Sequence, residues 1–237
     1  MIVATEQPYF APYPGFLYKA HLADAIVILD AVQFPRGTTW ISRNRFKNDR
    51  GHLWLTVPVW KKGLGLQRID EVRICYDFDW VRKHLQGLQT AYANAPYLSD
   101  HFPFIENVYR SGFERLLDLN LRLIRYLLKR YRIDTEVKLQ SELGIESQGT
   151  RLPVDICRRL KASDFLVQKA ALKYFDGEMF GDAGIALQPI KPPVCIYPQL
   201  WGSFLPNLSG FDLLFNCGPR SPEILLRRSP HREGAPV

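Results

Sequence analysis

Cysteine, histidine and long apolar runs are scarce in this sequence, and each scarcity excludes a class of protein. The chain has only four cysteines, which lie far apart: Cys75, Cys157, Cys195 and Cys217. Such spacing gives neither a disulfide framework nor a CxxC-type zinc site, so we expect buried or inert thiols. The longest apolar candidate, residues 23–29, contains Asp24 and falls far short of the roughly 20 residues that span a bilayer.

The familiar catalytic motifs are also absent. We find no HExxH, no P-loop lysine motif, no GxGxxG and no GxSxG nucleophile elbow. The remaining glycine pair, Gly63 and Gly65, is too weak a signal to indicate a nucleotide. His84 lies in an apolar helical stripe and is interpreted as a core histidine, while the other histidines show no ligand spacing. The sequence therefore assigns no metal and leaves the cofactor unknown.

Charge and the N-terminus restrict location and partners. The first residues lack the basic and apolar regions of a secretory signal, so we expect a cytoplasmic protein without a membrane span. The net charge is +7, and part of it lies in residues 227–237, which we expect to be a disordered tail. The remaining modest excess suits a phosphorylated or carboxylated small molecule, or only a solvated basic surface. The sequence contains no dense Lys/Arg stripe of the kind that indicates nucleic-acid binding.

The order of apolar segments predicts an α/β fold. Residues 2–5 form a short β-branched strand, and three prolines then give a stiff loop. A short helix from Gly15 leads to residues 25–29, a continuous apolar run typical of a strand buried on both faces. This succession predicts a parallel crossover. We expect a mostly parallel sheet with flanking helices and an inserted helical section, within a single domain of residues 1–226.

Periodicity places the other elements. Strands are predicted near residues 40–46, 54–59, 72–76, 137–139 and 164–167. Helices are predicted over residues 80–92, 113–131, 152–160, 170–175 and 211–215, the last opened by a capping box from Ser209 to Asp212. Asn120 falls inside the apolar stripe of the longest helix, where it needs a hydrogen-bond partner in a polar core network or in a ligand contact.

The loop after the first strand is the first candidate site. In open α/β sheets, loops at the carboxyl ends of parallel strands form the ligand crevice. Glu6 and Gln7 would stand there with Tyr9, held by the prolines at 8, 12 and 14, and Gly15 would let the backbone approach a ligand at a helix N-terminus. A proline-stiffened structural loop would give the same pattern.

The segment after residue 36 supplies a second candidate. A period of two puts Arg43 and Arg45 on one strand face and Trp40, Asn44 and Phe46 on the other. Two guanidinium groups on one face would hold a phosphate or carboxylate, with Asn44 and Arg36 nearby in the sequence. Surface arginines on an edge strand would look the same.

Three further polar residues complete the candidate set. Asp30 follows a buried strand at its carboxyl end, where a carboxylate meets a ribose hydroxyl, a metal or an amine, or else makes a simple turn or cap. Asp212 and Asn216 share a helical face with Ser209, so a polar row would point into a cleft. Helix capping explains two of these three without any function.

Several segments resemble one bacterial family. They are Glu6-Gln-Pro-Tyr-Phe-Ala-Pro-Tyr-Pro-Gly15, Ala23-Asp24 with Ile28-Leu-Asp-Ala-Val-Gln-Phe34, Arg43-Asn-Arg-Phe-Lys47, Trp54-Leu-Thr-Val-Pro58, Ala95-Pro-Tyr97, Ser141-Glu-Leu143, Tyr197-Pro-Gln199 and Asp212-Leu-Leu-Phe-Asn216 with Gly218. These segments resemble those of the WbqC-like family and follow one another in the same order, so the resemblance extends to about residue 220. Members of that family are found among genes for O-antigen and related surface polysaccharides, so the resemblance implies a cytosolic sugar-modifying or group-transferring role.

Two positions depart from the family pattern. The family usually opens with His-Gln-Pro, whereas this chain has Glu6, and the usual Trp-Leu before the glycine is Tyr13-Pro14 here. A mechanism that rests on the histidine would not carry over. The departure is consistent with a subgroup that uses a different substrate.

Three hypotheses follow. The first is a transferase that joins an amino-acid or acyl unit to an activated sugar, such as a nucleotide sugar, with Arg43 and Arg45 holding phosphate and Glu6 or Asp30 positioning an amine. The second is a nucleotide-binding enzyme similar to nucleotidylyltransferases. The third is a non-catalytic binding or assembly protein, favoured if no pocket gathers Glu6, Asp30 and the two arginines. The sequence gives no oligomeric state.

Overall fold

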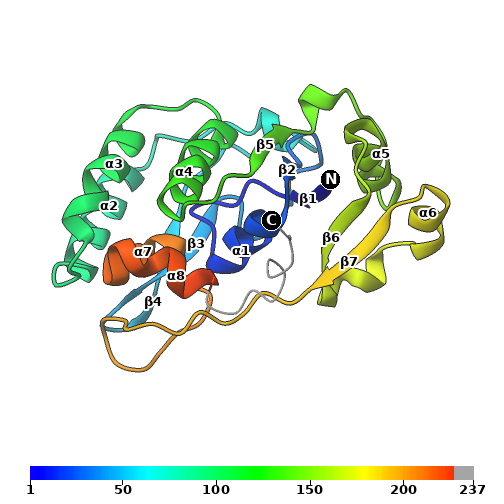
Figure 1. Cartoon of the computed structure of the whole chain (residues 1–237). Helices are drawn as coiled ribbons and strands as arrows, with labels where there is room; N and C mark the ends of the chain where they lie inside the picture. The colour runs from blue at the N-terminus through cyan, green and yellow to red at the C-terminus, as the bar shows by residue number, and fades with distance from the viewer. Residues whose placement is uncertain (227–237) are drawn as a thin grey trace.

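Five parallel strands form the central sheet of the computed structural model, which describes residues 1–226 (Figure 1). The sheet strands are β1 (Ile2–Glu6), β2 (Ala25–Ile28), β5 (Glu136–Leu139), β6 (Asp164–Gln168) and β7 (Ala186–Ile190). Two further strands, β3 (Arg43–Asn48) and β4 (Gly51–Thr56), form a separate antiparallel hairpin. The α/β class and the parallel sheet predicted from the sequence are confirmed.

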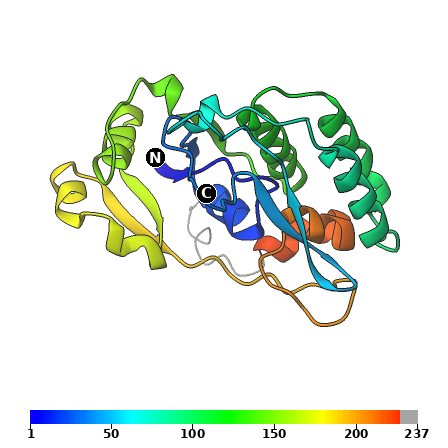
Figure 2. The ribbon, with the colours of Figure 1, turned by 180° about the vertical axis from the view of Figure 1, so that it is seen from behind.

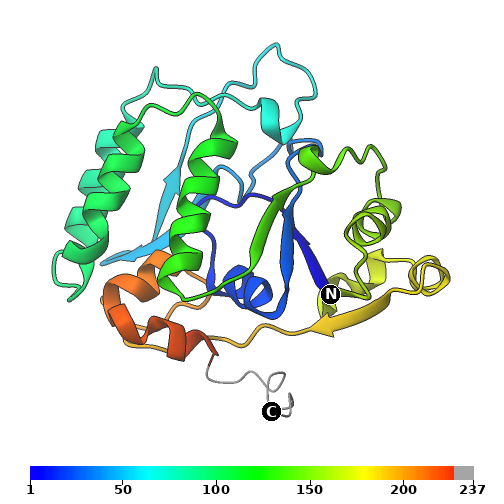
Figure 3. The same ribbon diagram turned by 45° about the horizontal axis from the view of Figure 1, so that its top comes forward.

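Helices surround this sheet. Within the described residues they are α1 (Pro14–Leu22), α2 (Trp80–Ala91), α3 (Leu98–Arg110), α4 (Leu116–Arg130), α5 (Arg151–Leu160), α6 (Gly177–Asp182), α7 (Gly210–Cys217) and α8 (Ser221–Leu226). The hairpin and α2 to α4 lie between β2 and β5 in the chain, which confirms the predicted insertion. Figure 3 shows this section at one end of the molecule and α5 and α6 at the other.

The strand order is β5-β2-β1-β6-β7, so the first strand of the chain lies in the middle. The chain proceeds outward from β1 to β2 and β5, then returns to β6 on the other side of β1. The sheet therefore changes its direction of winding between β1 and β6. In open parallel sheets, ligands bind at the carboxyl ends of the strands at such a switch point.

Alternate residues of the central strands face two different apolar cores. Ala4 and Ile26 pack in the larger core with α1 and the inserted helices, whereas Val3 and Ala25 pack in the smaller core with α5 and α6. Successive side chains of a strand point to opposite sheet faces, and both faces are covered here. This explains why β2 is continuously apolar rather than alternating.

A long connection joins the two ends of the molecule. Residues 191–209 follow β7 and return to the hairpin, as Figures 1 and 2 both show. The return is fastened at the hairpin, where the backbone N–H of Ser209 donates to the carbonyl of Arg45 at 2.8 Å. It is also fastened at α2, where Trp201 Nε1 donates to the carbonyl of Ala91 at 2.6 Å.

Several predicted elements differ from the structure. Residues 72–76 form no strand, because Arg73 and Ile74 make only isolated bridges. Residues 169–174 form a 3-10 helix rather than an α-helix, and this helix ends before Asp176, which caps α6. The helix predicted from residue 113 begins at Leu116, after an extended Arg115. Strand β7, which contains Pro189 at the sheet edge, was not predicted. The predicted disordered tail, residues 227–237, lies outside the described residues.

Other expectations concern buried groups. All four cysteines are free and buried, as predicted. His84 is a core histidine, as interpreted from the sequence, and its Nε2 accepts a hydrogen bond from the backbone N–H of Thr56 at 3.1 Å. Across residues 1–226, no helix combines the length and the hydrophobicity that crossing a membrane requires.

Candidate functional site

The proline-rich loop after β1 is held by two buried asparagines. Asn44 Nδ2 donates to the carbonyls of Phe10 and Ala11 at 3.0 and 2.7 Å. Asn120 Nδ2, from α4, donates to the carbonyls of Pro8 and Ile41 at 2.7 and 2.8 Å. The predicted need of Asn120 for a partner is thus met by a core network. These bonds fix the loop against both the hairpin and the inserted helices.

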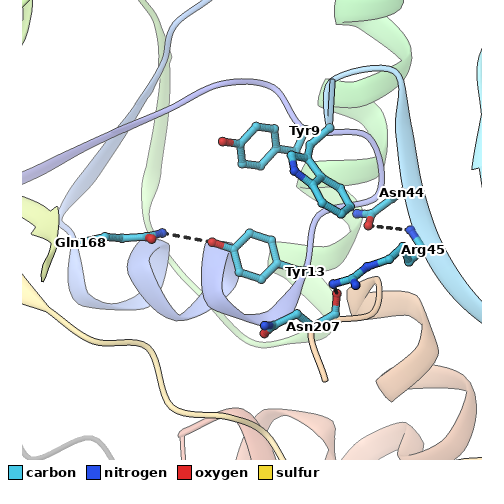
Figure 4. A pocket seen from close by; sticks show the side chains of 7 residues that line it. Tyr9, Tyr13, Asn44, Arg45, Gln168 and Asn207 are labelled. Atoms are coloured by element: carbon cyan, nitrogen blue, oxygen red, sulfur yellow. Dashed lines mark hydrogen bonds between the residues drawn. The ribbon is translucent and has the colours of Figure 1, made fainter. Parts of the chain in front are cut away.

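A pocket of about 300 Å³ opens beside this loop at the carboxyl ends of β1 and β6. Seven residues line it: Tyr9, Tyr13, Trp40, Asn44, Arg45, Gln168 and Asn207 (Figure 4). They come from the proline-rich loop, the hairpin, the end of β6 and the return segment. The pocket therefore lies at the switch point of the sheet, where α/β proteins bind ligands.

Arg45 carries the only formal charge in this lining. Its Nη2 donates to the carbonyl of Asn207 at 3.2 Å, while its Nε is buried without a hydrogen-bond partner. Within residues 1–226, no carboxylate forms an ion pair with Arg45. Partial burial lowers the pKa of Arg45. The pocket thus holds a partly desolvated cation whose donors are incompletely used.

The two tyrosines of the pocket are neutral donors. Tyr13 Oη accepts a hydrogen bond from Gln168 Nε2 at 3.0 Å, which leaves its own proton available. Burial raises the pKa of both Tyr9 and Tyr13, and the nearby Glu6 carboxylate raises them further. Both phenols therefore stay protonated at neutral pH and keep their O–H groups as hydrogen-bond donors.

Glu6 does not belong to the residues that line the pocket and lies behind them. Its Oε1 accepts a hydrogen bond from Lys19 Nζ of α1 at 3.0 Å, and both side chains are less than a tenth exposed. Lys19 also donates to the carbonyl of Thr5 at 2.9 Å. Glu6 is thus a partner in a buried ion pair that fastens α1 to β1. Gln7, next in the chain, is half-buried and is not part of the lining.

Arg43 shares a strand face with Arg45 but lies against an aromatic ring. Its Cζ lies 3.6 Å from the centroid of the Trp54 ring. The tilted ring of Trp40 lies close by, with its centroid 5.6 Å from that of Trp54 and 5.3 Å from Arg45 Cζ. The prediction that Trp40 lies opposite the arginines is wrong, because β3 begins at Arg43 and the period of two does not extend back to residue 40.

Asp30 and Arg36 lie away from the pocket. Asp30 is buried at the end of β2, where its carboxylate accepts from the backbone N–H and the hydroxyl of Ser141 at 2.9 and 2.5 Å. It therefore joins the loops that follow β2 and β5. Arg36 lines a separate hollow with Lys61 and Gln67. The structure brings together Tyr9, Asn44 and Arg45 of the predicted site residues, and does not gather Glu6, Asp30 and both arginines in one pocket.

Gly15 serves a neighbouring side chain. A Cβ at this position would lie 2.4 Å from an atom of the Tyr13 ring. The glycine is therefore needed so that Tyr13 can lie against the start of α1. The prediction that Gly15 brings the backbone close to a ligand is not what the packing indicates, since the Tyr13 ring takes that space.

Sequence reasoning missed Tyr13, Trp40, Gln168 and Asn207 as site residues. Gln168 ends β6, so a correct strand order would have placed it beside the end of β1. Tyr13 belongs to the loop already selected. Asn207 had no sequence signal, because it reaches the pocket only through the long return after β7. No group of three or more metal-ligating side chains gathers within residues 1–226.

Comparison with known proteins identifies the family. The sequence profile of the WbqC-like protein family matches residues 7–224. The chain belongs to the WbqC-like family. It is 28% identical over 225 residues to "Uncharacterized protein Rv1507c" of Mycobacterium tuberculosis (strain ATCC 25618 / H37Rv), which covers 94% of this chain and 96% of that protein. No solved structure matches the chain.

Three segments that carry the WbqC-like resemblance meet in one buried network. Asp212 of α7 accepts hydrogen bonds from the hydroxyls of Tyr92 and Tyr197 at 2.5 and 2.7 Å. Burial raises the pKa of Asp212 despite these donors. Lys47 Nζ, whose side chain is also buried, donates to Gln199 Oε1 at 3.1 Å and to the carbonyl of Ser203 at 2.7 Å.

This network holds the return segment rather than facing the pocket. Asn216 Nδ2 donates to the carbonyl of Asp212 at 2.8 Å, so the predicted polar row of α7 is used internally. Ser209 caps α7 by accepting from the N–H of Phe211, whereas the side chain of Asp212 makes no reciprocal capping bond. In the same WbqC-like region, a Cβ at Gly218 would lie 2.5 Å from the Tyr97 ring, so two matched segments pack face to face.

Proposed function

We propose that this WbqC-like protein is a group-transfer enzyme that binds an anionic small molecule in the switch-point pocket, with Arg45 as the anion contact. One observation carries the proposal: Arg45 is the one charged side chain among the residues that line the pocket, and no carboxylate of residues 1–226 pairs with it. A partly desolvated guanidinium without an ion-pair partner gains free energy from an anion that enters the pocket. Tyr9 and Tyr13 supply neutral donors for the rest of the ligand.

Binding is tested by comparing two arginines of the same strand face. Thermal unfolding of wild-type protein and of the Arg45→Gln and Arg43→Gln variants is measured with inorganic phosphate, D-glucuronate and D-glucose 6-phosphate as probes. We expect at least one anionic probe to raise the wild-type melting temperature, because ligands that bind only the folded state stabilise it. This shift should disappear in Arg45→Gln and persist in Arg43→Gln, whose guanidinium lies on Trp54.

An equal shift in all three proteins would contradict the assignment of Arg45. Loss of the shift in both variants would instead extend the anion site to Arg43. Far-ultraviolet circular dichroism of each variant checks that the fold is intact.

The transfer step belongs to the same proposal. It is supported by the position of the pocket, since the crevice at the carboxyl ends of parallel strands is where α/β enzymes place their chemistry. Membership of the WbqC-like family supports it as well. The resemblance of the sequence to that family implies a role in surface polysaccharides. We expect deletion of the gene to remove one acyl or aminoacyl substituent from the surface polysaccharide. Wild-type complementation should restore it, and Arg45→Gln should not. An unchanged polysaccharide would contradict this role.

A non-catalytic binding protein is the second candidate. It is favoured because, in the part of the chain that the structure describes, no pocket gathers Glu6, Asp30 and both arginines. The two carboxylates predicted to be catalytic are also occupied, Glu6 by Lys19 and Asp30 by Ser141. Mass spectrometry after incubation with an activated sugar together with an activated acyl or aminoacyl donor, whose carrier is the leaving group, separates the two candidates. A new covalent product supports transfer, and quantitative recovery of the unchanged compound supports binding alone.

A nucleotide-binding enzyme is the third candidate. The observation that favours it is the strand order, which matches the doubly wound arrangement that binds nucleotides at its switch point. Thermal unfolding with nucleotides, nucleotide sugars and magnesium tests it, since a free nucleotide must stabilise the protein if this candidate holds.

A further inference from the structure

We infer that the anionic group which binds at Arg45 is a carboxylate on a compound about the size of a single sugar or amino acid, and not a phosphate or diphosphate. This inference rests on the proposed function and narrows its substrate class. It draws on the charge of the pocket, the closed start of α1 and the size and walls of the cavity.

The pocket offers one cation, although three basic residues alternate along β3. Arg43 lies on the Trp54 ring, and Lys47 is buried against Gln199 and Ser203. Neither residue lines the pocket, so Arg45 is the only cation among the lining residues. The planar guanidinium fork fits carboxylate and phosphate oxygens alike, so the charge decides, and one cation balances the single charge of a carboxylate. Phosphate at neutral pH carries nearly two charges and has three acceptor oxygens to satisfy.

The start of α1 offers little to a phosphate. Helix N-termini bind phosphates through free backbone N–H groups. Here Pro14 has no N–H, and the N–H of Phe16 already donates to the carbonyl of Tyr13 at 3.0 Å. The Tyr13 ring lies directly against Gly15. The switch point therefore lacks the glycine-lined cradle of backbone donors that phosphate sites of this fold class use.

The size and the lining of the cavity favour a small ligand that is mostly neutral apart from its anionic group. A volume of about 300 Å³ lies at the lower end of the range for ligand pockets. Three aromatic side chains, from Tyr9, Tyr13 and Trp40, form much of the wall. Amide groups of Gln168 and Asn207 add neutral hydrogen-bonding capacity. This lining suits one ring or short chain with hydroxyl or amide groups.

Matched compounds that differ only in the anion test this inference. Ligand-observed NMR titrations compare D-glucuronate, D-glucose 6-phosphate and D-glucose, and separately 4-hydroxybenzoate and 4-hydroxyphenyl phosphate. We expect the carboxylate of at least one set to bind about tenfold or more tightly than its phosphate partner. Arg45→Gln should weaken that carboxylate by about 10- to 100-fold, the range for a charge-assisted hydrogen bond. Arg43→Gln should leave it unchanged.

Arg45→Lys separates the role of the charge from that of the planar fork. It keeps the positive charge but removes the two parallel N–H groups, so we expect the preference for carboxylate over phosphate to persist. Loss of the preference in Arg45→Lys would contradict selection by charge.

The outcomes separate this inference from the proposed function. If the phosphate members bind more tightly and Arg45→Gln abolishes their binding, the carboxylate inference is overturned and the anion site stands. If binding by every probe is indifferent to Arg45→Gln, or no probe binds at millimolar concentration, both proposals are overturned.

Discussion

Residue 6 shows how a buried carboxylate is balanced by a cation from another element. The Glu6 carboxylate, which lies inside the protein, is paired with Lys19. Buried ion pairs contribute little net stability as a pair, yet removal of one partner strands the other charge in an apolar environment. Glu6 and Lys19 are therefore expected to be coupled much more strongly than any surface pair of this protein.

Removal of one member of this pair should be costly. We expect Lys19→Met to lower the free energy of unfolding by about 3–5 kcal/mol, because it leaves the Glu6 carboxylate buried without its partner. The double variant Glu6→Gln with Lys19→Met should recover much of that loss. Urea unfolding measures both. Arg110→Gln breaks the exposed pair with Glu106 and should cost less than about 1 kcal/mol. Additive effects of the two buried changes would contradict the coupling.

Individual residues of the site were only partly predictable. Tyr9, Asn44 and Arg45 were selected because they are polar or aromatic residues on the loop and strand nearest the expected crevice. The role of Asn44 was misjudged, since its amide holds the loop through the carbonyls of Phe10 and Ala11. Asn207 could not be found, because its contact with Arg45 spans 162 residues of sequence and local patterns carry no such information.

Among the elements, α4 positions the site although it does not touch a ligand. Asn120 lies on its fully buried face and holds both the proline-rich loop and the segment before β3. The same helix supplies apolar side chains to the larger core. The amphipathic helix that was the strongest sequence signal thus orders the least regular part of the molecule.

Replacement of Asn120 should loosen this loop. We expect Asn120→Leu to lower the free energy of unfolding by about 2–4 kcal/mol, since two buried carbonyls lose their donor. Hydrogen exchange over residues 7–13 should accelerate as well. Asn107→Leu, an exposed position on α3, serves as the matched control and should leave both quantities nearly unchanged. Normal protection of residues 7–13 in Asn120→Leu would contradict the clamp.

Elements with strong local signals were predicted, and those that depend on neighbours were not. The continuous apolar run of β2 and the apolar stripe of α4 can be recognised directly in the sequence. Strand β7 contains Pro189 and is mostly exposed, so only its pairing with β6 defines it. Residues 72–76 look like a strand, yet the fold gives them no continuous partner.

At the scale of the whole molecule, two buried histidines link stability to pH. Burial lowers the pKa of His84 and of His101 to about 4. In the unfolded chain both should titrate near 6.5. Their folded pKa values are depressed, so the neutral rings favour folding above pH 6.5. That stability is lost as the pH falls from 6.5 toward 4, because the unfolded state then binds the extra protons.

The steepness of this loss can be measured. We expect the wild-type free energy of unfolding to fall between pH 6.5 and 4, with His84 contributing at most about 1.4 kcal/mol per pH unit. His84→Gln should be less stable at pH 7.5, because its contact with Thr56 is altered, and should show a shallower decline on acidification. Urea unfolding across this pH series provides the test. Parallel curves for the two proteins would show that His84 does not carry the linkage.

The tryptophan that lines the pocket gives the protein an optical reporter of its own. Of the five tryptophans, Trp40 lines the cavity, and Trp54 lies beside its ring without belonging to the lining. Indole emission responds to nearby charge and to water, so a compound that enters beside Trp40 should change the intrinsic fluorescence without any attached dye. Trp40→Phe should abolish that change in fluorescence. The native Trp40 ring could therefore be used to screen compounds for binding to the pocket.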